Sequence, residues 1–167
     1  MRAILAPILV LAALALPAWA ETAPGPTEPS PAAMSFVAGF SDDHLSGMLS
    51  RIGGRSEALS VLAQVHGRLT GQVFDQEIDR AVAARGPEWQ RNLALAWTPL
   101  MSEAELTSLT NAGAQSPHVE KYLDLRGAAG ERMQELSGDL FGEILEDVVR
   151  ATYARLTPEP TGEEATE

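Results

Sequence analysis

Three histidines are the side chains of this sequence best suited to chemistry, because imidazole binds metals and transfers protons near neutral pH. His44, His66 and His118 lie in three separate segments of the chain. A zinc site on a helix needs ligands on one face, as in His-Glu-x-x-His, and these histidines are spaced too far apart for that pattern. We therefore predict no metal ligands and no cofactor.

Two pairs of carboxylates lie one helical turn apart, Asp75 with Asp79 and Asp139 with Glu143. Such pairs can share a proton or bind a cation. Neither pair has an opposing group or a series of loop ligands, so a solvated helix face is the favoured interpretation. The sequence also lacks a nucleophile elbow, a phosphate-binding loop, a dinucleotide fingerprint and any cysteine. These absences predict a protein that is not an enzyme.

The remaining conspicuous side chains are aromatic. Trp89 and Trp97 are spaced to share one face of a helix, and Tyr122 follows in a later segment. Packing in a core is the favoured interpretation of this spacing. The alternative is that Trp89, Trp97 and Tyr122 form a candidate ligand pocket or partner surface.

These residues must be positioned by helices. Apolar residues recur at intervals of three and four between residues 34 and 156, and strand-like alternation is absent. We predict an all-α fold, a compact bundle of about five or six helices. The expected breaks are a bend near Gly67 and Gly71, a new helix at Gly86-Pro87, an end near Pro99, and an interruption at Gly127 and Gly130.

Helix starts are marked by capping residues. Ser41 is predicted to cap the first helix. Ser102 and Glu105 have the spacing of a capping box, in which each side chain accepts a hydrogen bond from the other residue's backbone N–H. Ser116 as cap and Pro117 in the first turn are predicted to start the following helix. These five residues are interpreted as structural, without a role in chemistry.

The two ends of the chain differ from the centre. Residues 1–20 read as a signal peptide, with Arg2, an apolar stretch and a cleavage site after Ala20. Residues 21–33 are rich in proline and predict a disordered linker. A single helical domain is expected over 34–156, followed by a disordered acidic tail over 157–167. The expected location is the periplasm, with no membrane span after cleavage.

The formal net charge of −11 limits the choice of partner. Nucleic acid is excluded as a partner, because affinity for it comes largely from neutralising phosphates. Anionic membrane surfaces are disfavoured for the same electrostatic reason. Another envelope protein is the expected partner, and the sequence leaves the oligomeric state open.

A family resemblance rests on the residues after the capping box. The order Ser102, Glu105-Leu106, Ser116-Pro117 and Lys121-Tyr122 resembles the family of small exported bacterial proteins called domain of unknown function twenty fifty-nine. The resemblance covers residues 85–150. Val119 stands where the family usually has glycine. The resemblance implies an α-helical, periplasmic protein and supplies no catalytic residue.

Three functions remain in competition. The favoured hypothesis is a non-enzymatic interaction or chaperone-like envelope protein. The alternative is a carrier of a small apolar ligand or lipid between the helices near Trp89, Trp97 and Tyr122. A hydrolase with an unrecognised site is the third. A filled bundle interior would favour the interaction protein, whereas an open apolar cavity would favour the carrier.

Overall fold

The chain is helical throughout the part that is described. The computed structural model describes residues 28–158, so the predicted signal peptide, most of the linker and most of the tail lie outside the described residues. These residues form six α-helices and one short 3₁₀ helix, without a β-strand, which confirms the predicted all-α class. The helices are α1 Pro31–Ala38, α2 Ser41–Gly53, α3 Glu57–His66, α4 Arg68–Trp97, α5 Glu103–Ala112 and α6 Val119–Leu156, with η1 Gly113–Gln115 between the last two.

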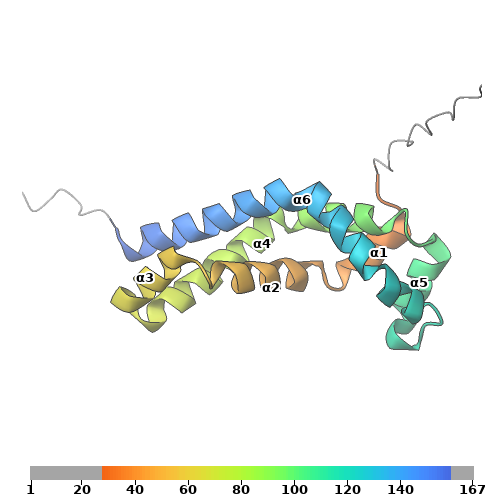
Figure 1. Ribbon diagram of the computed structural model, residues 1–167, viewed down its shortest axis with the longest axis horizontal. Coiled ribbons are helices and arrows are strands. Elements are labelled where there is room, and N and C mark those ends of the chain that lie inside the picture. The colour runs from red at the N-terminus through yellow and green to blue at the C-terminus, as the bar shows by residue number, and fades with distance from the viewer. Residues whose placement is uncertain (1–27, 159–167) are drawn as a thin grey trace, which may run out of the picture.

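Two long helices organise the others (Figure 1). α4 and α6 pack against each other along the length of the molecule, and α2 lies on α4 beside them. α3 packs at one end of this pair, whereas α1 and α5 pack together at the other end. Within the described residues, no helix has the length and apolarity needed to cross a bilayer.

The core follows the seam between the long helices, because their apolar residues recur at helical spacing. Trp89, Leu45, Leu49, Leu106 and Ile144 are among its most deeply buried side chains. α1 contributes Ala33 and Val37, which are both fully buried. A chain without cysteine therefore depends on this apolar packing for its stability.

The predicted linker extends three residues too far. Residues 31–33 were assigned to it, but Pro31 is the first residue of α1. Ser30 caps this helix by accepting a hydrogen bond from the backbone N–H of Ala33 at 3.1 Å. Proline is favoured in a first turn, where its missing N–H costs nothing. Pro31, one of the prolines that suggested disorder, instead marks a helix start.

The prediction that Ser41 caps the first long helix is wrong. Phe40 occupies the cap position, and Ser41 is already in the first turn of α2, where its hydroxyl contacts Asp42. The connection from α1 contains only Gly39 and Phe40. The backbone N–H of His44 donates to the carbonyl oxygen of Phe40, so α2 starts as soon as α1 ends.

The helix breaks in the middle of the chain also differ from those predicted. A bend was predicted near Gly67, but the helix is broken there: Gly67 separates α3 from α4. Its φ of 58° lies in the region that favours glycine. Pro87, predicted to start a helix, lies inside α4. Apolar residues on both sides of it, such as Ile78 and Trp89, are buried, and this packing outweighs the local penalty of about 3 kcal/mol. α4 ends at Trp97, before Pro99, as predicted.

The predicted interruption at Gly127 and Gly130 is absent, and α6 is continuous for 38 residues. Each glycine disfavours a helix by about 1 kcal/mol relative to alanine. Ala129 and Met133, in the same turns of the helix, are buried. Their packing keeps this part of α6 helical.

The capping box before α5 is confirmed. Ser102 Oγ accepts from the backbone N–H of Glu105 at 3.4 Å, and Glu105 accepts from the backbone N–H of Ser102 at 2.8 Å. The start predicted at Ser116-Pro117 is corrected by two residues, because these residues form a turn and α6 begins at Val119. Ser116 Oγ accepts from the backbone N–H of His118 at 3.2 Å, so it caps the turn rather than the helix.

The capping box is joined to α6 by an ion pair, which makes the stability of this joint dependent on pH. Lys121 Nζ lies 2.8 Å from both carboxylate oxygens of Glu105. Hydrogen bonds from Lys121 and from the backbone N–H of Ser102 lower the pKa of Glu105 from an ordinary 4.5 to about 2. The unfolded chain therefore takes up this proton at a higher pH than the folded chain.

We expect the contribution of Glu105 to be complete above about pH 5 and to be lost as the pH falls from 4.5 towards 2. Glu105→Gln should make the free energy of unfolding less dependent on pH in that range. Urea unfolding at a series of pH values measures this. Glu103→Gln, two residues before Glu105 and exposed, is the control and should keep the dependence of the wild type. An unchanged slope in Glu105→Gln would contradict the prediction.

Candidate ligand-binding groove

A groove runs between α2 and α6, with α4 as its floor. It exists because α2 and α6 both pack on α4 but make few contacts with each other. Its volume is about 730 Å³, within the usual range of about 300–1,000 Å³ for small-molecule sites. We call it the aromatic groove. It is lined by Phe40, His44, Met48, Ile52, Trp89, Leu93, Trp97, Tyr122, Arg126, Ala129, Gly130, Met133, Gln134, Ser137, Gly138 and Phe141.

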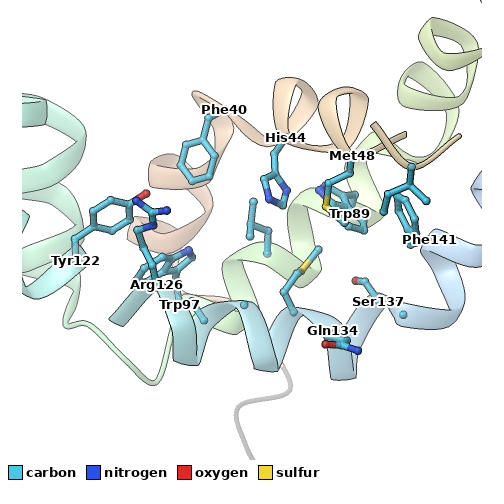
Figure 2. A pocket seen from close by; sticks show the side chains of 16 residues that line it. Phe40, His44, Met48, Trp89, Trp97, Tyr122, Arg126, Gln134, Ser137 and Phe141 are labelled. Atoms are coloured by element: carbon cyan, nitrogen blue, oxygen red, sulfur yellow. The ribbon is translucent and has the colours of Figure 1, made fainter. Parts of the chain in front are cut away.

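Aromatic rings line the aromatic groove at both ends (Figure 2). At one end Trp97 stacks on Tyr122, with ring centroids 5.0 Å apart. Towards the other end Trp89 lies 6.1 Å from Phe141 and 5.7 Å from His44. Both tryptophans are almost fully buried, so their rings are held rigidly by the core and present fixed surfaces to the groove.

The wall formed by α6 includes four small residues. Ala129, Gly130, Ser137 and Gly138 line the groove, at spacings that put them on one face of the helix. A Cβ atom added at Gly130 or at Gly138 would meet no atom within 4 Å. At these two positions the α6 wall is therefore open in front of the backbone.

The floor of the groove holds one polar group without a partner. Trp89 Nε1 is buried and makes no hydrogen bond among the described residues. A buried donor left in this state costs about 1–3 kcal/mol. Ser137 is different, because its hydroxyl accepts from Asn92 Nδ2 at 2.9 Å. Because the indole nitrogen is itself buried, this donor lies beneath the surface of the groove.

The charges that line the groove are few. None of its lining residues is Asp or Glu, although the chain has 23 of them. Burial of its ring lowers the pKa of His44, and the charge of Arg51 lowers it further, so His44 is uncharged at neutral pH. Arg126 is then the only charged side chain that lines the groove.

The three aromatic residues predicted as a candidate site do come together. Trp89, Trp97 and Tyr122 all line the aromatic groove, and both tryptophans are core residues as well. The sequence allowed two interpretations of these rings, packing in the core and lining of a pocket. The two tryptophans do both. Phe40, Met48, Phe141 and Arg126 were missed as site residues. The small residues at helical spacing on α6 were the signal that could have located the groove.

The residues considered for metal binding and catalysis are dispersed. The histidines lie on α2, at the end of α3 and in the turn before α6. Asp75, Asp79, Asp139 and Glu143 are all exposed. Across residues 28–158, His, Asp and Glu side chains nowhere gather in threes that could hold a metal ion. The described part of the chain therefore offers a binding surface but no assembled group of reactive side chains.

Comparison of the chain with protein-family models, with curated proteins and with solved structures gave no match in any of the three. The resemblance to domain of unknown function twenty fifty-nine therefore stays a prediction from residues 85–150. What the protein binds has to be argued from the groove itself.

Proposed function

We propose that this chain is a non-enzymatic carrier that holds a small apolar ligand in the aromatic groove. The observation that carries the proposal is an open cavity of about 730 Å³ with mainly apolar and aromatic walls. Gly130 and Gly138 line this cavity, and nothing lies within 4 Å of the position of a Cβ added at either residue, so this side of the cavity is open. The sequence favoured an interaction protein and gave the carrier as the alternative; this geometry supports the carrier.

The chemistry of the lining also supports binding rather than catalysis. The serine hydroxyl that lines the groove, Ser137, is hydrogen-bonded to Asn92 and not to a base that could activate it. Met48 and Met133 add flexible, polarisable walls, which suit ligands of variable shape. We propose in addition that the carrier is exported to the periplasm; this part rests on residues 1–20 alone.

A substitution that fills the groove tests the proposal. Gly130→Leu places a large side chain in the open space of the groove, and leucine is also a better helix former than glycine. We expect the variant to fold and to bind the neutral apolar dye N-phenyl-1-naphthylamine at least about tenfold more weakly than the wild type. Dye fluorescence, including energy transfer from Trp89 and Trp97, measures the binding.

Gly127→Leu is the matched control for this experiment. Gly127 lies on the same helix with open space before it, but it does not line the groove. The control should bind the dye as the wild type does. A wild-type protein that does not bind the dye, or a Gly130→Leu variant that binds it equally well, would refute the carrier.

A separate observation supports an interaction protein as the second candidate. Val61, Val65 and Leu69 are 54%, 73% and 49% exposed around the junction of α3 and α4, and none of them lines the groove. Exposed apolar side chains that lie close together often mark contacts with another protein. A photocrosslinker at Val65 that captures a defined envelope protein, while one at exposed Gln64 does not, would favour this candidate.

A further inference from the structure

The position of Arg126 suggests which ligands the aromatic groove selects, if the proposed carrier function holds. Arg126 lies on α6 next to Tyr122, at the end of the groove that Phe40 overhangs (Figure 2). Neither the guanidinium of Arg126 nor the hydroxyl of Tyr122 forms a hydrogen bond or ion pair within residues 28–158. Two donors at one end of an apolar groove are therefore available to a ligand.

The lack of an ion pair at Arg126 has a cause in the sequence. On a helix, side chains three or four positions apart are neighbours. These positions around Arg126 hold Tyr122, Leu123, Ala129 and Gly130, none of which is acidic. By contrast, Arg150 on the same helix is paired with Glu146 at 2.7 Å and with Asp147 at 3.2 Å. Arg126 thus keeps its positive charge uncompensated beside the groove.

The shape of the groove adds a second condition. Its lining residues on α6 extend from Tyr122 to Phe141, which at about 1.5 Å per residue corresponds to roughly 28 Å along the helix. Beyond Arg126 the lining residues of α2 and α4 are apolar or uncharged, namely Met48, Ile52, Trp89 and Leu93 with His44. The groove is therefore long and apolar with a single charge near one end.

We propose that the aromatic groove binds amphiphiles with one linear apolar chain and an anionic head group, and that Arg126 binds the head group with the Tyr122 hydroxyl beside it. The apolar chain lies along α6 towards Phe141. A carboxylate and a phosphate monoester share the chemistry that a guanidinium recognises, since both accept paired hydrogen bonds from it. A cationic head group would be repelled by Arg126, and a neutral one would gain nothing from it.

Calorimetric titration of the full mature protein tests this with four probes of equal chain length: decanoate, decyl phosphate, 1-decanol and decyltrimethylammonium. We expect the wild type to bind at least one of the two anions about tenfold or more tightly than the alcohol, and the cation most weakly. Arg126→Gln should remove the preference for anions and leave the affinity for 1-decanol within about twofold. Arg126→Lys should retain part of the preference.

Arg150→Gln is the control, because it changes the net charge equally on the same helix but outside the groove. A difference between decanoate and decyl phosphate assigns the head group as a carboxylate or as a phosphate. Equal affinities for anionic and neutral probes, or an equal effect of Arg126→Gln and Arg150→Gln, would overturn the role of Arg126 while leaving the carrier intact. Failure of all four probes to bind would overturn both proposals.

Discussion

Replacement of Trp97 by alanine is expected to lower the free energy of unfolding by about 3–5 kcal/mol. Trp97 is only 4% exposed and is the last residue of α4. Its ring stacks on Tyr122 of α6 and lies edge-on to Phe36 of α1, at 5.8 Å between centroids. Loss of the ring therefore leaves a cavity where three helices meet, and urea unfolding measures its cost.

Two further variants serve as comparisons for Trp97→Ala. Trp97→Phe keeps an aromatic ring in the site and should cost less than Trp97→Ala. Leu123→Ala removes an apolar side chain that is 50% exposed on α6, and it should change stability by no more than about 0.5 kcal/mol. A loss below about 1 kcal/mol for Trp97→Ala would show that α1, α4 and α6 do not depend on this ring.

Gly53→Ala is expected to destabilise the fold by about 1–3 kcal/mol, although alanine is the better helix former. Gly53 is the last residue of α2 and is buried. An added Cβ would lie 2.5 Å from Phe74 Cζ and 3.1 Å from Leu145 Cδ1. Phe74 is itself buried, so its ring has little room to move aside. Thermal or urea unfolding measures the loss.

Gly71→Ala provides the opposite result for comparison. Gly71 is exposed inside α4 and has nothing within 4 Å of the position of an added Cβ. This substitution should stabilise the protein by up to about 1 kcal/mol, because only helix propensity changes. A Gly53→Ala variant that gained stability in the same way would contradict the close approach of α2 to α4 and α6.

The fold class could be predicted because helical periodicity and capping signals depend only on residues close together in the sequence. The capping box at Ser102 and Glu105 needs only four residues, and it was confirmed. Pro87 was misjudged because the burial of Trp89 and Ile78 against other helices overrides a local signal. Helix ends that depend on such tertiary packing are not encoded within the segment itself.

The candidate site was only partly predictable for the same reason. The spacing of Trp89 and Trp97 placed them on one helix face, and Tyr122 was grouped with them by residue type. The groove, however, depends on a gap between α2 and α6, and it includes Phe40 and Phe141 from distant parts of the chain. The same limit applies to Glu77, whose pair with Arg155 at 2.7 Å joins residues 78 positions apart.

The positive φ angle of Gly67 has a consequence for assembly. This one residue separates α3 from α4 and lets Leu59 and Leu62 fold back to pack in the core of their own molecule. A residue with a Cβ would be strained in this conformation. A helix continuous through both segments would carry Leu59 and Leu62 away from their own core, so exchange of the segment before Gly67 between two chains would give a route to a swapped dimer.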